Sequence, residues 1–221
     1  MTKTVTALRF QKRDKDRVNV YLDDQFAFGL AAIEAAHLRI GQTLSKVDIA
    51  QLQKQDEIEK AYQRALNFLS YRPRSEAEVR RNLHKKEVDD AVIEMALERL
   101  TQAGLLDDLE FARYWIENRI QFNPRGARAL RHELWEKGVD TSVVDEALED
   151  FDEESSARKA AEAGARRLTN LEPRDFRRKF KGYMARRGFS YAVIKPLMEE
   201  KLEAAHCETS FNSESEEKYN G

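Results

Sequence analysis

The chain has few of the residues that build disulfides, metal centres or membrane spans. Its 221 residues include one cysteine, Cys207, which excludes an intramolecular disulfide and any site made of several cysteines. No apolar run approaches the roughly 18 residues of a membrane-spanning helix, and the N-terminus has no apolar segment followed by a small-residue cleavage site. We therefore expect a cytoplasmic protein that does not enter a membrane.

Motifs for catalysis are also missing from the sequence. It contains neither a phosphate-binding G-x-x-x-x-G-K-[ST] loop nor a G-x-G-x-x-G turn. None of the four histidines belongs to an H-E-x-x-H zinc motif. The pair Asp107-Asp108 is better interpreted as a helix N-cap than as metal ligands. The sequence therefore predicts a protein that is not an enzyme and has no metal and no cofactor.

Charge is abundant but unevenly distributed. Charged residues make up 35% of the chain and apolar residues 41%, and the net charge is −2. Residues 199–221 carry seven acidic and two basic side chains, whereas residues 166–187 carry nine basic and two acidic side chains. Such segregation indicates basic faces that meet an anionic partner, although solvated helix faces give the same pattern.

The strongest pattern is a block of about 50 residues that occurs three times. A Pro-Arg step marks the register of each block: Pro73-Arg74, Pro124-Arg125 and Pro173-Arg174. An N-cap candidate follows two residues after each proline: Ser75, Gly126 and Asp175. Further on, an apolar residue precedes a second N-cap candidate: Val88-Asp89, Val139-Asp140 and Phe189-Ser190. Repeats of this length predict stacked helical units that share a core and present long binding surfaces.

The predicted fold is mainly α: a tandem array of three three-helix repeats, with a small N-terminal β-meander and a disordered acidic C-terminal tail. The predicted domains are an N-terminal meander plus helices (1–55), three repeats (56–106, 107–155 and 156–203) and the tail (204–221).

The N-terminal segment alternates in polarity as strands do. Residues 3–10, 18–22 and 26–30 predict three strands, the third with Phe26, Phe28 and Leu30 on one face, followed by a short helix over 30–38. Ser45 is the expected N-cap of the next helix, and the pattern leaves open whether that helix continues to Ala61.

Three residues in the repeats carry further predictions. Trp115 and Trp135 are expected to pack in the core or between repeats rather than to stack on bases. Pro196, inside the last predicted helix, is expected to kink or shorten it.

Basic residues recur at related places in the repeats, on and just before the middle helices. A line of arginines suits bidentate recognition of phosphates or carboxylates, and solubility is the alternative explanation. The candidate partner- or DNA-binding residues are Arg74, Arg80, Arg81, Arg125, Arg128, Arg131, Lys137, Arg174, Arg177 and Arg178.

Several stretches resemble the bacterial RecX regulatory proteins. They are S-E-A-E-V-R-R-N-L from Ser75, G-L-L-D-D from Gly104, F-A-R from Phe111, R-G-A-R-A-L-R-H-E-L from Arg125, K-G-V from Lys137 and, more loosely, R-R-G-F from Arg186. The resemblance covers about residues 57–200, with the second repeat the most specific part. It implies a curved array of three-helix units, without catalytic residues, that lies along the RecA–DNA filament and restrains its recombinase, ATPase and coprotease activities.

Three hypotheses stay open at this point. The first is a monomeric modulator of the RecA nucleoprotein filament that binds single- or double-stranded DNA weakly by itself. The second is an autonomous DNA-binding helical-repeat protein, which predicts tight DNA binding with a steep salt dependence. The third is a scaffold that binds acidic proteins and never meets DNA.

Overall fold

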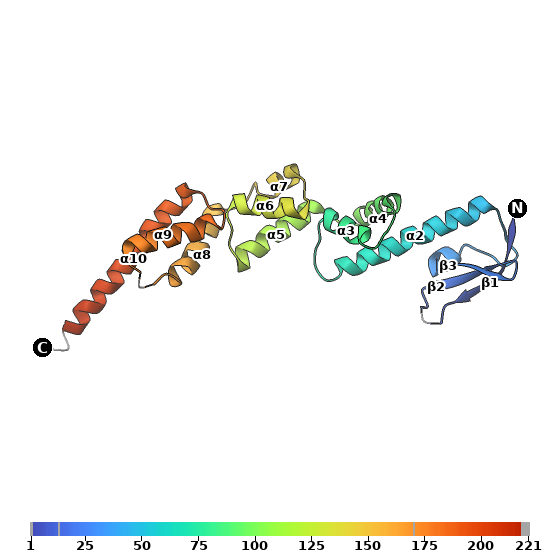
Figure 1. Cartoon of the computed structure of the whole chain (residues 1–221), viewed down its shortest axis with the longest axis horizontal. Helices are drawn as coiled ribbons and strands as arrows, with labels where there is room; N and C mark the ends of the chain where they lie inside the picture. The colour runs from blue at the N-terminus through green and yellow to red at the C-terminus, as the bar shows by residue number, and fades with distance from the viewer. Residues whose placement is uncertain (1, 13, 170, 218–221) are drawn as a thin grey trace. The chain divides into compact units, whose positions relative to one another are not determined.

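A computed structural model describes residues 2–12, 14–169 and 171–217, with side chains as far as Ala204. The chain separates into two compact units, Met1–Asp107 and Asp108–Gly221. The first unit holds the N-terminal sheet and the first helical repeat, and the second unit holds the other two repeats (Figure 1). Three three-helix repeats after an N-terminal sheet confirm the predicted fold class.

The N-terminal sheet is antiparallel and has one strand more than predicted. Strands β1 (Lys3–Phe10), β2 (Arg17–Leu22) and β3 (Gln25–Ala31) form the predicted meander. A short strand β4 (Thr43–Leu44) pairs with β1, which gives the order β3-β2-β1-β4. A two-residue strand is too short to show alternation, so its pairing could not be predicted from sequence.

The pairing of β2 with β3 corrects the predicted face of one aromatic residue. Phe26 was expected on the same face as Phe28, but Phe26 is 60% exposed whereas Phe28 is buried. Val20 pairs with Phe28 and Tyr21 with Phe26, so β3 carries one extra residue at this point. Such a bulge turns the following side chains to the other face, and the Phe26 ring lies against Tyr21 at 6.1 Å between centroids.

Two helices follow the sheet. Helix α1 (Ala32–Ala35) has four residues and is shorter than the predicted helix over 30–38. Helix α2 (Lys46–Leu69) begins after Ser45, which forms a capping box with Asp48 as predicted for an N-cap. This helix is unbroken and passes through residue 55, so it touches the sheet at one end and the first repeat at the other. The proposed domain boundaries stay a prediction.

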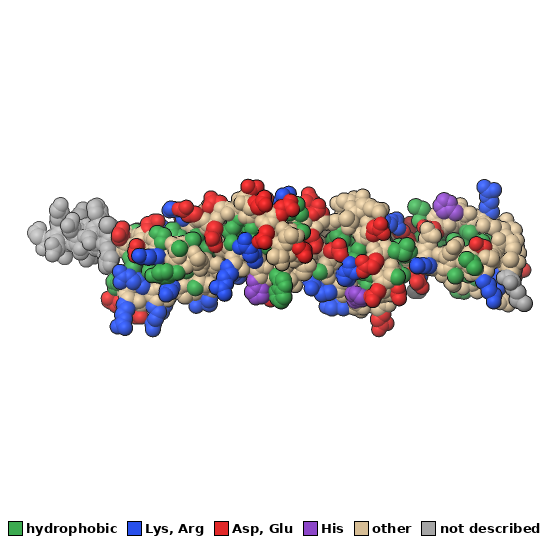
Figure 2. All heavy atoms as spheres, turned by 90° about the horizontal axis from the view of Figure 1, so that it is seen from above, with side chains coloured by type: hydrophobic (Ala, Val, Ile, Leu, Met, Phe, Trp, Pro, Cys, Tyr) green, Lys and Arg blue, Asp and Glu red, His purple; other side chains and the backbone are tan. Residues whose placement is uncertain are grey.

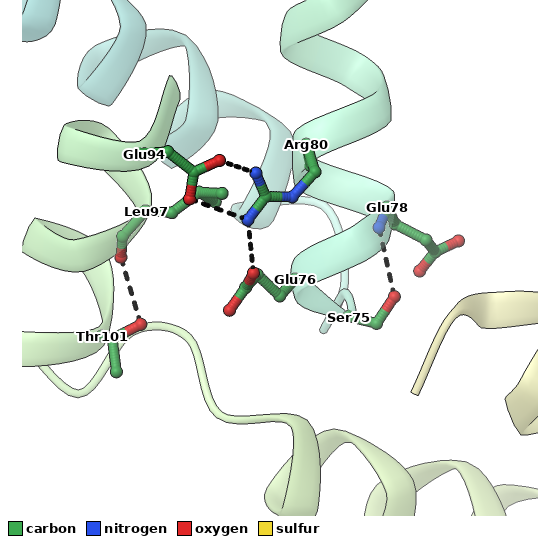
Figure 3. Close-up of polar contacts among 7 residues, drawn as sticks. All are labelled: Ser75, Glu76, Glu78, Arg80, Glu94, Leu97 and Thr101. Atoms are coloured by element: carbon green, nitrogen blue, oxygen red, sulfur yellow. Dashed lines mark hydrogen bonds and ion pairs between the residues drawn. The ribbon is translucent and has the colours of Figure 1, made fainter. Parts of the chain in front are cut away.

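The first repeat packs the second half of α2 against α3 (Glu76–His84) and α4 (Asp90–Gln102). Its core contains Ala61, Ala65, Val79, Leu83, Val92, Ile93, Ala96, Leu97 and Leu100. The predicted N-caps are confirmed, since the Ser75 hydroxyl accepts the Glu78 N–H and the Asp89 carboxylate accepts the Ala91 N–H. Figure 3 shows the Ser75 cap at the start of α3.

The second and third repeats use the same plan. The second consists of α5 (Asp108–Phe122), α6 (Ala127–Lys137) and α7 (Thr141–Ala147), and the third of α8 (Glu153–Arg166), α9 (Pro173–Ala185) and α10 (Tyr191–Glu217). Helix α5 starts at Asp108, directly after Asp107, as the N-cap interpretation predicts. The prediction for Asp175 is wrong: it lies in the first turn of α9, because proline is readily accepted at the first helical position and Pro173 starts the helix.

Helix α10 is longer than the sequence predicts. It runs through Pro196, whose freed acceptor on Ala192 belongs to an exposed stretch of the helix. Its backbone also continues as helix to Glu217, within the segment predicted to be disordered. Residues 199–204 are mostly strong helix formers, which favours helix at the start of this segment. Leu202 is the last residue of its core cluster, and residues 218–221 lie outside the described residues.

Candidate interaction surfaces of the repeats

Arg80 forms ion pairs that link two helices of the first repeat. Its guanidinium donates to Glu76 at 2.7 Å and to both carboxylate oxygens of Glu94, one of them at 3.1 Å (Figure 3). The hydrogen bonds to Glu94 and then to Glu76 raise the pKa of Arg80 above its usual value. Two carboxylates neutralise this cation, so Arg80 links α3 to α4. Its neighbour Arg81 is exposed.

Arg74 is also packed into the first repeat. Its guanidinium carbon lies 4.0 Å from the centre of the Phe68 ring, a cation–π contact. Its Nε is buried and has no hydrogen-bond acceptor among the described residues. Burial, and then the positive charge of Arg72, lower the pKa of Arg74. Only part of this candidate contact residue is therefore open to a partner.

Arg125, at the equivalent place in the second repeat, belongs to a network around Glu133. The Glu133 carboxylate accepts from Trp115 Nε1 at 2.9 Å and from Arg119 Nε at 2.6 Å. Arg125 Nε lies 3.3 Å from Glu133 Oε1. The N–H does not point at this oxygen as in a hydrogen bond, so the contact is an ion pair. The network ties the loop before α6 to α5 and α6.

Trp115 is packed as predicted, between two cations. The guanidinium carbon of Arg119 lies 4.4 Å from the centre of the Trp115 ring, and Lys137 Nζ lies 4.9 Å from it. The indole also lies against Phe111 of the second-repeat core. Lys137, a candidate contact residue, is therefore partly engaged inside its own repeat.

Arg187 is a site residue that the candidate set does not contain. Its guanidinium stacks on Tyr183 at 3.8 Å, and its Nε is buried without an acceptor among the described residues. Burial lowers the pKa of Arg187, and the charges of Arg125, Arg167 and Arg186 lower it further. The signal in the sequence was the R-R-G-F stretch, which points to this position only through the resemblance.

The remaining candidates are exposed. Arg131 donates to Asp145 at 3.0 Å and Arg178 to Asp175 at 2.9 Å. Arg128, Arg174 and Arg177 have no ion pair within the described part of the chain. Figure 2 shows lysine and arginine side chains gathered on one face of the third repeat, towards the left of the view. The structure thus separates the candidates into cations that brace a repeat and cations that face solvent.

The outer face of α6 brings together residues that the sequence assigned to different roles. Arg128, Arg131, His132 and Trp135 follow the i, i+3, i+4, i+7 spacing of a single face. The prediction that Trp135 is packed is wrong, because its side chain is 67% exposed. Leu130 and Leu134 fill the inner face of this one helix, which leaves Trp135 on the outside.

Metal-binding clusters and membrane-spanning helices are not found among the described residues. No group of three or more His, Cys, Asp or Glu side chains among them is placed to hold a metal ion. Within the same residues, no helix is both long and apolar enough to cross a membrane.

The fold and its surfaces define a class: a helical-repeat protein that presents arginine-rich faces and carries an N-terminal sheet. Family models match in the same order along the chain. Residues 3–45 match the regulatory protein RecX N-terminal domain, and residues 61–100, 107–148 and 152–198 match the first, second and third RecX three-helix domains. The chain belongs to the RecX family of regulatory proteins.

Individual relatives support this assignment. The regulatory protein RecX of Bacillus subtilis is 34% identical over 201 residues, which is 89% of this chain and 76% of the relative. That of Oceanobacillus iheyensis is 32% identical over 208 residues, or 90% and 76%.

Two solved structures share the fold. A crystal structure of regulatory protein RecX has a TM-score of 0.74 at 30% identity and covers 89% of this chain and 99% of its own. RecX from Lactobacillus salivarius has a TM-score of 0.60 at 26% identity, with 66% and 97% covered. The resemblance seen in the sequence over about residues 57–200 is confirmed, and the family match also includes the N-terminal strands.

Proposed function

We propose that this chain binds the RecA–DNA filament and modulates, mostly by inhibition, its recombinase, ATPase and coprotease activities. The observation that carries the proposal is family membership along the whole repeat array, with relatives named regulatory protein RecX. In this proposal the protein acts as a cytoplasmic monomer without catalytic residues, metal or cofactor. DNA repair, recombination and the SOS response are the processes that it would affect.

The exposed arginines are the proposed contacts with the filament. Arg128 on α6 and Arg174 and Arg177 on α9 have no ion pair among the described residues, so binding a phosphate or carboxylate would not require breaking an internal pair. Arg80 and Arg125 already serve carboxylates of their own repeats. A partner's anion would therefore have to compete with these internal carboxylates, which makes both residues weaker candidates for the contact.

The same exposed arginines support a second candidate function, autonomous DNA binding. Neutralising phosphates releases counterions, so affinity for single-stranded DNA would fall with salt at a slope of about −0.7 per phosphate contacted. Three solvent-facing arginines without an ion pair in the described part of the chain favour this alternative, whereas the acidic segment 199–221 opposes it by adding negative charge.

The deciding experiment is the rate of ATP hydrolysis by RecA on single-stranded DNA, titrated with this protein well below the RecA concentration. The proposal expects suppression at substoichiometric amounts, since one modulator would then affect a filament of many subunits. A pull-down with DNA, RecA and their complex is run in parallel. Retention of DNA alone with an unchanged ATPase rate would favour the DNA-binding protein. Retention of neither DNA nor the filament would favour the scaffold.

A further inference from the structure

Trp135 is an exposed aromatic residue on a well-packed helix. Its side chain is 67% exposed, whereas Leu130 and Leu134 of the same helix are fully buried. The indole lies at a tilt beside the His132 ring, with 6.0 Å between the ring centres. Exposed tryptophan is favoured at protein interfaces, because a large rigid ring buries much apolar surface at little entropic loss.

Trp135 forms one side of a pocket between α6 and α7. The pocket has a volume of about 360 Å³ and is lined by Arg131, His132, Trp135, Val139, Thr141 and Val144. Val139 and Val144 are each only 3% exposed, so they also belong to the core of the second repeat. The pocket is therefore mostly apolar and rests on a rigid base, as suits an inserted side chain.

Charges of both signs surround this pocket. Arg131, the one lining residue that is a permanent cation, donates to Asp145 at 3.0 Å in an exposed ion pair. Asp140 directly follows Val139, and hydrogen bonds from the Ser142 side chain and backbone lower the pKa of its carboxyl group. Glu136, next to Trp135, is a further exposed carboxylate. Arg128, two turns before Trp135 on the same face of α6, is exposed and has no ion pair among the described residues, so this face presents a cation and carboxylates around an apolar centre.

We propose that the α6–α7 pocket binds an apolar side chain of a protein partner, with a basic residue beside it that faces Glu136 and Asp140. An apolar centre surrounded by charged groups of both signs is the usual composition of a protein–protein contact. The inference deepens the proposed function, since it rests on that proposal for the partner's identity: the protein part of the RecA–DNA filament. It assigns Trp135 to contact with protein, on the same face of α6 as Arg128 and Arg131.

The first test replaces Trp135 by alanine. The matched control is Phe122→Ala, because Phe122 is a 71% exposed aromatic residue at the end of α5 in the same repeat. In the RecA ATPase assay, Trp135→Ala is expected to raise the concentration for half-inhibition by at least about tenfold, and the control by less than about twofold. Thermal unfolding of both variants should match the unchanged protein, since neither side chain belongs to the core.

The second test addresses the acidic rim. Glu136→Lys is expected to weaken inhibition several-fold, because it replaces attraction for a basic residue by repulsion. Glu117→Lys is the control, with the same change of charge at an exposed position of α5. If both variants weaken inhibition equally, the effect comes from the change in net charge and not from Glu136 beside the pocket. That outcome would overturn this part of the inference.

The outcomes also separate this inference from the proposed function. Inhibition by Trp135→Ala equal to that of the unchanged protein would overturn the pocket and leave the function standing. If Trp135→Ala loses as much affinity for an isolated dT oligonucleotide as it loses inhibition of RecA, Trp135 is a base-stacking residue and the pocket proposal is also overturned.

If the unchanged protein does not inhibit RecA, the pocket is tested by phage display of peptides, with counter-selection on Trp135→Ala. Peptides with an apolar residue beside Lys or Arg support the pocket, and acidic peptides or no enrichment reject it. Sedimentation that finds a dimer dispersed by Trp135→Ala would assign the pocket to a second copy and reject the partner.

Discussion

Gly126 and Gly188 touch backbone to backbone where the second repeat meets the third. The Gly126 N–H donates to the Arg187 carbonyl at 2.9 Å, and a Cβ on Gly126 would lie 2.6 Å from the Gly188 oxygen. Gly126 has an ordinary extended conformation, with φ −81° and ψ 161°, so it is this close approach that requires glycine. It lacks a capping side chain, and Glu153 of α8 instead accepts the neighbouring Ala127 N–H at 2.9 Å. A residue of the third repeat, Glu153, therefore caps the N-terminus of α6 in the second repeat.

Gly126→Ala is expected to destabilise the junction by about 1–3 kcal/mol, since the added methyl meets backbone atoms that cannot move aside easily. Urea unfolding of the full chain, followed by hydrogen exchange of α6 and α8 amides, measures the loss.

Gly182→Ala in α9 is the matched control. There the added Cβ would approach only the end of the Arg186 side chain, at 3.2 Å, and alanine favours a helix over glycine by about 1 kcal/mol. Unchanged or increased stability is expected. A loss equal to that of Gly126→Ala would show that the backbone contact is not the cause.

Asp56 connects the N-terminal sheet to α2. This carboxylate is only 3% exposed and accepts from the Ala31 N–H at 3.0 Å, from Arg17 Nη2 at 2.9 Å and from Lys60 Nζ at 2.6 Å. Asp56→Ala removes the shared acceptor of three donors, and we expect a loss of about 2–4 kcal/mol, since both cations keep part of their hydration. Urea denaturation monitored by far-UV circular dichroism measures it.

Glu57→Ala is the control for Asp56, one residue along the same helix and exposed. It should change stability by no more than about 0.5 kcal/mol. Similar losses in both variants would mean that α2 helicity, rather than the buried cluster, sets the result.

The sequence predicts what depends on local chemistry. The caps at Ser75, Asp89 and Asp140 are side chain–backbone hydrogen bonds between residues two or three apart, so the sequence alone places them. Phe26 and Trp135 were misplaced because their exposure depends on a bulge and on which face of a helix meets its neighbours.

The candidate site shows the same limit. A recurrent line of basic residues identifies arginines but not their partners. Arg80 turned out to bridge two carboxylates and Arg125 to approach Glu133, whereas Arg128 is exposed. Which cation is neutralised depends on carboxylates brought in by other helices, as with Glu94 of α4, fourteen residues from Arg80.

Lowering the pH should reduce the stability of the first unit, because Glu59 contributes to it as a carboxylate. This carboxyl group is 7% exposed; burial raises its pKa, but hydrogen bonds from Gln63 and Arg99 outweigh burial and lower the pKa overall. A depressed folded-state pKa gives stability that is fully present above the unfolded-state pKa, about 4.3 for glutamate, and is lost as the pH falls through the folded-state value. Unfolding free energy measured between pH 7 and pH 3 should therefore decline below about pH 4.5.

Glu59→Gln should reduce the stability at pH 7 and make the acid decline shallower, because a titrating group is removed. Glu57→Gln, two residues earlier on the exposed side, should keep the original slope. If both variants keep the original slope, Glu59 does not contribute to the acid dependence.

Arg128 and Arg131 give the sharpest test of the arginine face of α6. Replacing both by glutamate should abolish inhibition of RecA-driven strand exchange while the helical circular dichroism stays unchanged, since both side chains are exposed. Arg128 has no ion pair among the described residues, and Arg131 would lose only its exposed pair with Asp145, worth about 0–1 kcal/mol. The control is Lys54→Glu with Arg64→Glu, the same change of four charge units at exposed positions of α2. Full inhibition by the α6 variant would remove this face from the filament contact, and loss in both variants would indicate a general effect of charge.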